Sequence, residues 1–237
     1  MKGNAAPRTL IEAASAPYRA AGRFALHFAR GKLTHDPAFA VILAQGLLAG
    51  RGRILDLGCG QGLLAAWLTA ARSEHAAGRW PPGWPPPPPA PDSYRGVEIN
   101  PHEVERARIA LGARVQIVAD DIRQADYGSP DAIVMLDVLH YVDPASQEAV
   151  LTRARTALGA RGLLVLRVAD ADGGVRFRIS RCVDRAVALV RRGRLLRLCC
   201  RPAREWHSLL VALGFAVRAS PMRAAASANV LLVGELQ

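Results

Sequence analysis

Short apolar runs alternate along the chain with segments whose apolar residues recur at helical spacing. Five of the runs predict strands, at residues 54–57, 94–99, 115–118, 132–136 and 163–166. The segments between them carry apolar residues every three to four positions, as on one face of a helix. Strands that alternate with helices predict an α/β fold, in which helices cover both faces of a parallel sheet.

The two ends of the chain depart from this alternation. Residues 8–49 predict a series of helices, so we expect a helical N-terminal cap over residues 1–50 and a main domain over residues 51–237. Two apolar runs near the C-terminus, 215–217 and 229–233, are joined by a loop without a crossover helix. We therefore expect the last two strands to be antiparallel.

Two insertions interrupt the main domain. Residues 78–92, GRWPPGWPPPPPAPD, predict an extended, solvated polyproline segment, because proline is excluded from helix interiors and central strands. A tolerated surface insertion is one interpretation of this segment, and a ligand for a proline-recognising domain is the other. Residues 169–202 predict a basic helical insertion, with apolar side chains on one side and arginines on the other.

Composition narrows the class of protein. The chain has 237 residues, of which 51% are apolar, but no apolar run approaches the roughly 18–20 residues that span a bilayer. The N-terminus lacks the apolar core of a secretory signal, and the four cysteines lack CxxC spacing. These features predict a cytoplasmic chain with free thiols.

The net charge of +11 is concentrated in one segment. Residues 176–201 hold nine arginines against a single acid, Asp184. A solvated helix face is the plainest explanation. An acidic carrier protein, an anionic membrane surface or a nucleic acid would also suit such a segment.

The stretch ILDLGCGQGLL, residues 54–64, places three glycines between a predicted strand and a predicted helix. The dinucleotide-binding pattern GxGxxG would need a glycine at Leu63, so this interpretation fails. The pattern DxGxGxG fits instead, with an acid near the strand end and bare backbone that lets a ligand approach closely. Cys59, between two of the glycines, is expected to be a small packing residue rather than a nucleophile.

With this turn the sequence resembles the class I S-adenosylmethionine-dependent methyltransferases, over residues 53–236. The resemblance implies a doubly wound, Rossmann-like sheet of seven strands in the order 3-2-1-4-5-7-6, with strand 7 antiparallel. This order agrees with the elements predicted from the sequence. It also implies S-adenosyl-L-methionine as the cofactor, and a lid formed by the N-terminal helices and by residues 169–202.

Glu98 matches the acid that, in this family, ends the second strand and accepts hydrogen bonds from both ribose hydroxyls. A carboxylate suits this role because it accepts two donors at once. Glu98 lies 36 residues after Gly62, against a usual spacing of about 20. Removal of the 15 residues of the 78–92 insert leaves 21, so the insert explains the long spacing.

Two further strand ends resemble motifs of the family. After the third strand, Asp121 aligns with the acid that contacts the adenine amino group and Ile122 with the residue that packs on the ring, although Asp120 could replace Asp121. The end of the fourth strand, at Leu136 and Asp137, resembles the motif that follows the methionine part of the cofactor. The residues that the resemblance implies for cofactor binding are Asp56, Gly58, Cys59, Gly60, Gly62, Glu98, Ile99, Asp120, Asp121, Ile122, Leu136 and Asp137.

The chemistry implied by this family needs little from the protein. A sulfonium methyl group is already a good electrophile, so the chain must align an acceptor and exclude water, and no metal is required. His140 and Tyr141, just beyond the fourth strand, are the candidate catalytic residues, with His140 as a base; the alternative is that His140 only shapes the cofactor pocket. Arg167 could hold an anionic group of the acceptor, or form a salt bridge with Asp170 or Asp172.

The expected function is methyl transfer to oxygen or carbon of a small-molecule or carrier-bound acceptor. The lid segments faintly resemble those of bacterial methyltransferases of polyene or fatty-acid-like pathways. Methylation of RNA is an alternative, although the fourth strand lacks the [DNS]-P-P-[YF] stretch of enzymes that methylate nucleic-acid amino groups. A catalytically silent cofactor-binding scaffold and an enzyme that transfers an aminopropyl group are also compatible with these motifs. The sequence predicts no oligomeric state.

Overall fold

The computed structural model describes residues 6–174, 198–222 and 228–237. Its seven strands follow the order β3-β2-β1-β4-β5-β7-β6 along the sheet, so the predicted order is confirmed. The chain divides into two compact units, residues 1–121 and 122–237, which are described in turn. The strands are β1 (Arg53–Leu57), β2 (Ser93–Glu98), β3 (Gln116–Ala119), β4 (Ala132–Leu136), β5 (Leu163–Ala169), β6 (Phe215–Met222) and β7 (Asn229–Leu236).

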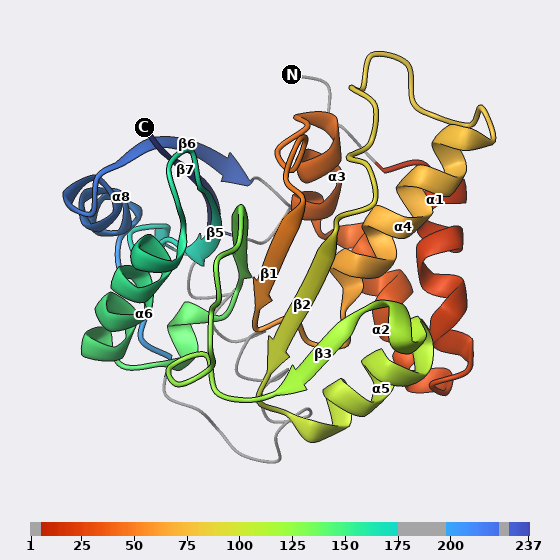
Figure 1. Cartoon of the computed structure of the whole chain (residues 1–237), viewed down its shortest axis with the longest axis horizontal. Helices are drawn as coiled ribbons and strands as arrows, with labels where there is room; N and C mark the ends of the chain where they lie inside the picture. Colours follow the sequence, from red (N-terminus) through yellow and green to blue (C-terminus); the bar gives the residue numbers. More distant parts are fainter. Residues whose placement is uncertain (1–5, 175–197, 223–227) are drawn as a thin grey trace. The chain divides into compact units, whose positions relative to one another are not determined.

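The first unit combines three parallel strands with most of the helices. β2 pairs in parallel with β1 on one side and with β3 on the other. Helix α1 lies along α4, as Figure 1 shows. The helices of this unit are α1 (Arg8–Ser15), η1 (Ala16–Arg19), α2 (Arg23–His35), α3 (Pro37–Ala44), α4 (Leu63–Ala76), α5 (Pro101–Leu111) and η2 (Gly112–Arg114).

Two helices of this unit begin at a capping residue followed by a proline. Asp36 accepts a hydrogen bond from the amide of Ala38 at 3.0 Å, and Asn100 accepts one from the amide of His102 at 3.0 Å. Each cap is followed by a proline at the first helical position, where the missing N–H costs nothing. These caps fix where α3 and α5 begin.

The proline-rich insert is extended, as expected, but it is only partly solvated. Pro88 is buried and Pro85 packs against the turn at Gly46, while Pro86 and Pro89 are exposed. The indole N–H of Trp80 donates to the carbonyl of Pro85 at 3.0 Å. A polyproline helix has three residues per turn, so positions 85 and 88 share the face that packs on the unit.

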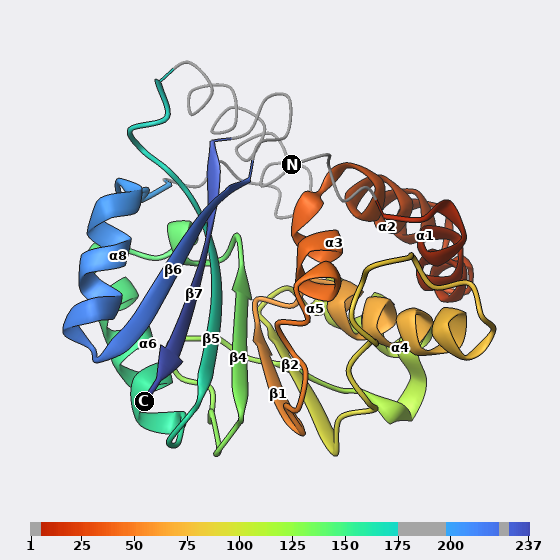
Figure 2. The same ribbon diagram turned by 90° about the horizontal axis from the view of Figure 1, so that it is seen from above.

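The second unit completes the sheet. β4 and β5 are parallel, whereas β7 is antiparallel to both β5 and β6, which confirms the prediction for the last two strands. Helix α8 lies beside β6, as Figure 2 shows. The helices of this unit are η3 (Leu139–Tyr141), α6 (Pro144–Ala157) and α8 (Ala203–Ala212).

The last three strands are longer than their apolar runs suggest. β6 continues to Met222 through Ser220 and Pro221, and β7 continues to Leu236. β6 can continue through Ser220 and Pro221 because it is an edge strand, where polar residues and proline are tolerated since one row of backbone groups faces away from the sheet.

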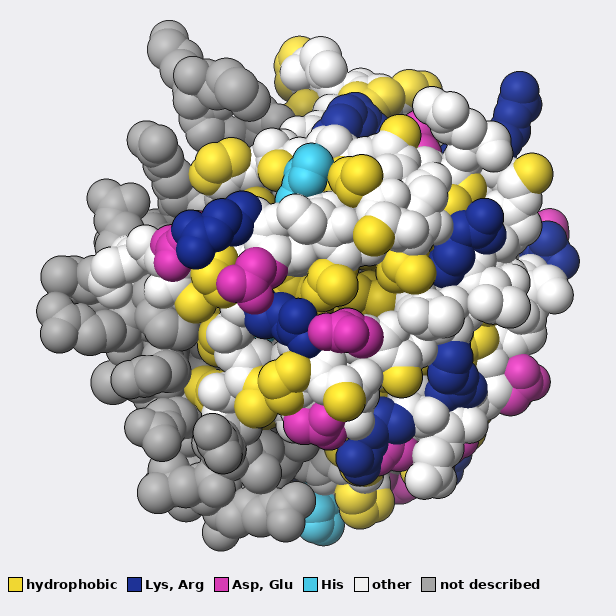
Figure 3. Space-filling view, turned by 90° about the vertical axis from the view of Figure 1, so that its left-hand side faces the viewer, with side chains coloured by type: hydrophobic (Ala, Val, Ile, Leu, Met, Phe, Trp, Pro, Cys, Tyr) yellow, Lys and Arg dark blue, Asp and Glu magenta, His cyan; other side chains and the backbone are white. Residues whose placement is uncertain are grey.

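Most of the basic segment predicted at 169–202 lies outside the described residues, which include only 169–174 and 198–202 of it. Among the described residues of the second unit, arginines pair with acids, as in Arg201 with Glu148 and Arg204 with Asp172. Figure 3 shows basic and acidic side chains next to one another on one face of the molecule. None of the helices described has the length and apolar character needed to cross a membrane.

One glycine is required by a close approach inside the first unit. A Cβ atom on Gly96 of β2 would lie 2.7 Å from the Sγ atom of Cys59 and 2.7 Å from the Cδ1 atom of Ile117. Cys59 and Ile117 belong to a buried cluster with Val104 and Ala107. Gly96 therefore lets the glycine turn pack directly on β2.

We predict that Gly96→Ala lowers the free energy of unfolding by about 1–3 kcal/mol, because the added methyl group overfills this contact. The matched control is Gly31→Ala in α2, where an added Cβ atom meets nothing within 4 Å. This control should instead stabilise the chain by about 0.5–1 kcal/mol through helix propensity. Urea unfolding of both variants checks the prediction, and equal effects would contradict it.

Candidate functional site

The glycine turn between β1 and α4 has a backbone that only glycine adopts without strain. Gly58, Gly60 and Gly62 have φ angles of 75°, 57° and 76°, all in the left-handed region. The amides of Gly58 and Cys59 both donate to the carbonyl of Val97 on β2, at 2.8 and 3.1 Å. The turn is thus fixed to the neighbouring strand by backbone contacts, as the three alternate glycines predict.

Glu98, at the end of β2, holds two backbone amides with its carboxylate. One oxygen accepts from the amide of Gly60 at 3.0 Å, and the other accepts from the amide of Asn100 at 2.9 Å. The side chain is nearly buried, with 5% of the residue exposed. A carboxylate has about four acceptor positions, so these bonds leave capacity for two more donors. The remaining acceptor positions would suit a pair of neighbouring hydroxyl groups.

Asp56, on β1, is buried beneath the turn and paired with a tyrosine. The hydroxyl of Tyr94 on β2 donates to an oxygen of Asp56 at 2.5 Å, and the residue is 4% exposed. Burial raises the pKa of Asp56 to about 7; the hydrogen bond from Tyr94 lowers it, and the charge of Glu98 raises it further. Sequence reasoning missed Tyr94, because a tyrosine on a strand is the ordinary signal of a packing residue.

The N-terminal helices are attached to the glycine turn through buried polar groups. The hydroxyl of Tyr18 in η1 donates to the carbonyl of Gln61 at 2.8 Å. The side-chain amide of Gln61 donates in turn to the carbonyl of Ala25 in α2 at 3.0 Å, and neither Tyr18 nor Gln61 is exposed. Burial also raises the pKa of Tyr18 above its ordinary value, so the hydroxyl stays a donor. These bonds fix η1 and α2 relative to the turn.

The remaining predicted residues of the first unit follow β2 and β3. Ile99 is 50% exposed, although it is a large apolar residue. The amide of Asp120 donates to the carbonyl of Glu98 at 3.1 Å, and the amide of Asp121 donates to the side chain of Asp120 at 2.7 Å. The structure therefore brings Glu98, Ile99 and the two aspartates together at the ends of neighbouring strands.

In the second unit, Asp137 follows β4 and is held by Arg167 of β5. The guanidinium donates from Nε to one carboxylate oxygen at 2.7 Å, and Nη2 contacts the other oxygen. Arg167 is 2% exposed, and Asp137 has a φ angle of 59°, which is strained for a residue other than glycine. The predicted pairing of Arg167 with Asp170 or Asp172 is wrong. Asp137 is nearer because β4 and β5 are paired so that Leu136 lies opposite Arg167.

The candidate catalytic residues His140 and Tyr141 lie on η3, directly after this pair. Their ring centroids are 4.2 Å apart, and His140 is 3% exposed. The carbonyl of His140 accepts from the amide of Cys199 at 2.8 Å. Leu136, the last residue of β4, is half-buried, and Ile122, three residues after the end of β3, is buried.

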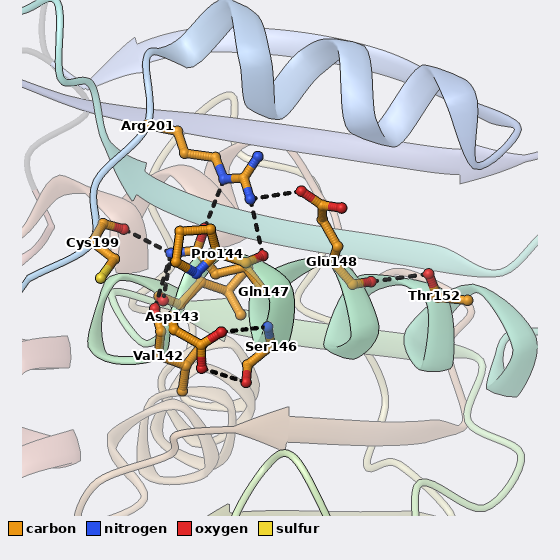
Figure 4. A network of polar contacts seen from close by, with 10 residues as sticks. Val142, Asp143, Pro144, Ser146, Gln147, Glu148, Thr152, Cys199 and Arg201 are labelled. Carbon is orange, nitrogen blue, oxygen red and sulfur yellow. Dashed lines mark hydrogen bonds and ion pairs between the residues drawn. The ribbon is translucent and has the colours of Figure 1, made fainter.

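A buried glutamine fixes the segment that carries His140. The side-chain nitrogen of Gln147 in α6 lies 3.1 Å from the carbonyl oxygen of Leu139, 3.2 Å from that of Val142 and 2.7 Å from that of Cys199. Its side-chain oxygen accepts from Nε of Arg201 at 2.8 Å, and Figure 4 shows the network. Sequence reasoning missed Gln147, which looks like an ordinary polar residue in the first turns of a helix.

Arg201 connects the same network to the N-terminal turn of α6. It donates to the carbonyl of Pro144 at 2.9 Å and to the carboxylate of Glu148 at 2.7 Å, as Figure 4 shows. A planar guanidinium can make such forked contacts, whereas a lysine could not. Arg201 and Gln147 therefore fasten residues 199–201 to η3 and α6.

Comparison with known proteins agrees with this geometry. Residues 25–220 match the family described as Methyltransferase domain. A carboxy-S-adenosyl-L-methionine synthase from Chromohalobacter salexigens is 34% identical over 143 residues, which are 55% of this chain and 47% of that protein. The chain thus spans about half the length of this curated relative.

Solved structures of low sequence identity share the fold. Magnesium protoporphyrin IX methyltransferase from Synechocystis, with bound S-adenosylhomocysteine, has a TM-score of 0.58 at 19% identity, over 91% of this chain and 89% of that one. An O-methyltransferase family protein from Burkholderia thailandensis has a TM-score of 0.62 at 18% identity, over 92% and 62%. Human N-acetylserotonin methyltransferase, in complex with S-adenosylmethionine, has a TM-score of 0.56 at 15% identity, over 95% and 59%.

The strand order and the glycine turn define a class I methyltransferase fold. The chain belongs to the Methyltransferase domain family, whose match covers more than four-fifths of its length. The predicted methyltransferase family is confirmed, and two of the solved structures that share its fold hold S-adenosylmethionine or S-adenosylhomocysteine. The roles of the individual site residues stay predictions.

We predict that Gln147→Leu lowers the free energy of unfolding by about 2–4 kcal/mol, because it takes a donor from buried carbonyl oxygens and one acceptor from the Arg201 guanidinium. The matched control is Glu148→Gln, which weakens an exposed ion pair worth at most about 1 kcal/mol. Urea unfolding compares the two. Similar losses for both variants would show that the buried glutamine has no special role.

The raised pKa of Asp56 predicts how stability depends on pH. Between about pH 4 and pH 7 the folded chain keeps a proton that the unfolded chain has released, so the contribution of this group to stability falls as the pH rises through that range. Asp56→Asn keeps an acceptor for Tyr94 without the charge. In the cofactor-free protein it should raise Tm by several degrees at pH 8 and by clearly less at pH 5. An equal shift at both pH values in thermal unfolding would refute this.

Proposed function

We propose that this protein transfers the methyl group of S-adenosylmethionine to oxygen or carbon of a small-molecule or carrier-bound acceptor. The observation that carries the proposal is the Glu98 carboxylate, which is ordered by the amides of Gly60 and Asn100 and retains acceptor capacity for a ribose. Bare backbone at Gly58, Gly60 and Gly62 and the exposed side chain of Ile99 support it.

In this proposal the chain binds the cofactor and orients the acceptor. The bound cofactor supplies a sulfonium methyl group, which is an electrophile with a neutral leaving group. Asp120 or Asp121 would accept from the adenine amino group, and Ile99 would cover part of the ring. His140 and Tyr141 are the candidates for taking a proton from the acceptor.

A small-molecule acceptor is favoured over a nucleic acid. The solved structures of similar fold include a porphyrin methyltransferase and an N-acetylserotonin methyltransferase, both named for small acceptors. Several of the arginines described in the second unit pair with acids, among them Arg201, Arg204 and Arg218, which leaves fewer of them for phosphate groups. We also propose an acidic carrier protein or an anionic membrane surface as the partner of residues 176–201. A cap over residues 1–50, a lid over residues 169–202 and a cytoplasmic location are further parts of the proposal.

A second candidate function is suggested by the relative at 34% identity, whose name says that it makes a carboxylated form of the cofactor itself. In that case the chain would modify S-adenosylmethionine rather than donate its methyl group. Mass spectrometry of the small molecules that copurify with the protein separates the two functions. An intact S-adenosylmethionine or its thioether product supports methyl transfer, and a carboxylated form supports the second candidate.

The test of cofactor binding is calorimetric titration with S-adenosylmethionine. We expect Glu98→Gln to weaken binding by about 10–100-fold, because one or two hydrogen bonds to a charged acceptor are lost. The matched control is Glu105→Gln, an exposed glutamate on α5, which should leave the affinity unchanged. Equal affinities for both variants would remove Glu98 from the site.

A further inference from the structure

A set of acidic and phenolic side chains lies beneath the glycine turn, and the proposed contacts to the cofactor use only part of it. Asp56 is at its centre and accepts from the Tyr94 hydroxyl at 2.5 Å. The titratable groups around it are Tyr94 and Glu98 on β2, Cys59 in the turn and Tyr18 on η1. Glu103 of α5 acts on Cys59 and Tyr18 in the same way.

All of these groups are neutral or negative, and they are buried; a nearby cation, Arg106, pairs with Glu103 at 2.9 Å. Asp56, Glu98 and Glu103 are 4%, 5% and 1% exposed. A negative charge inside such a region costs free energy because it loses water and meets other negative charges. Burial accordingly raises the pKa of Asp56 to about 7, so the protonated and ionised forms of this carboxyl group are similarly populated at neutral pH.

A positive charge nearby would shift this balance toward the ionised carboxylate. The effect does not need direct contact, because Coulomb interactions in a partly buried site act over several ångströms. S-adenosylmethionine brings such a charge in its sulfonium group, and the thioether product lacks it. The Tyr94 hydroxyl meanwhile stabilises the ionised form by donating a hydrogen bond.

We propose that the Tyr94–Asp56 pair makes cofactor binding proton-linked, so that the site prefers the cationic sulfonium cofactor over its uncharged thioether product as the pH rises. Asp56 is the specificity-determining charge, and Tyr94 is its positioning residue. This inference rests on the proposed function, since it concerns the same cofactor site. The product would then compete less well with the sulfonium cofactor above neutral pH, because it brings no positive charge to the ionised carboxylate.

The experiment is calorimetric titration with S-adenosylmethionine and with S-adenosylhomocysteine between pH 6 and pH 8.5, in two buffers of different ionisation enthalpy. The ionised fraction of a carboxyl group with a pKa near 7 rises about tenfold from pH 6 to pH 8. The affinity for S-adenosylmethionine should rise by up to that factor, with release of about half a proton at pH 7. The affinity for S-adenosylhomocysteine should rise clearly less.

Two variants isolate the pair. Asp56→Asn should abolish the proton release that comes from the protein. Subtracting the protons released on binding to this variant from those released on binding to the unmodified protein removes the contribution of the ligand's own amino group, whose pKa is about 8. Tyr94→Phe should weaken binding at pH 7 and recover most of it at pH 8.5, because it moves ionisation of Asp56 to higher pH. A purely structural defect would not recover with pH, so this second variant tests the pair independently of Asp56→Asn.

The outcomes separate this inference from the proposed function. Binding of S-adenosylmethionine with the same affinity and no proton release across the pH range contradicts the inference and leaves the proposed function intact. Proton release that persists unchanged in Asp56→Asn also contradicts it. Failure of the unmodified protein to bind either ligand at any pH contradicts the proposed function and the inference together.

Discussion

The hydrogen bonds between the Glu98 carboxylate and two backbone amides are the interactions on which the first unit depends. They join the end of β2 to the glycine turn at Gly60 and to the start of α5 at Asn100. Hydrogen bonds to a charged acceptor in a nearly buried position are among the stronger ones in proteins. A carboxylate at this point therefore orders both backbone segments and presents its free lone pairs at the ends of the parallel strands, where open sheets bind ligands.

Buried polar contacts extend this order outward in each unit. In the first unit, Tyr18 and Gln61 attach the N-terminal helices to the turn, so that the backbone around Gly60 is fixed from both sides. In the second unit, Gln147 and Arg201 fasten residues 199–201 to η3 and α6. Each contact satisfies backbone carbonyl groups that burial would otherwise leave without a partner, which is why such side chains are costly to replace.

Much of the fold could be predicted from sequence, because it depends on local patterns. Apolar runs predict the strands, and the glycine spacing together with Glu98 predicts the family. The contacts made by single polar side chains could not be predicted. Tyr94, Gln61 and Gln147 have no periodicity that distinguishes them from packing or surface residues, and the partner of Arg167 depends on the register between β4 and β5. The burial of part of the proline-rich insert could not be predicted either, because Pro85 packs against the turn at Gly46, far away in sequence.

The central claim is that Glu98 holds the ribose of the cofactor next to the glycine turn. A crystal structure of the protein with S-adenosylhomocysteine tests it most directly. The structure should show both ribose hydroxyls within hydrogen-bond distance of the Glu98 carboxylate, with the bonds from the Gly60 and Asn100 amides retained. A ligand bound elsewhere, or a Glu98 side chain that stays turned toward the two amides without contacting the ribose, would contradict it.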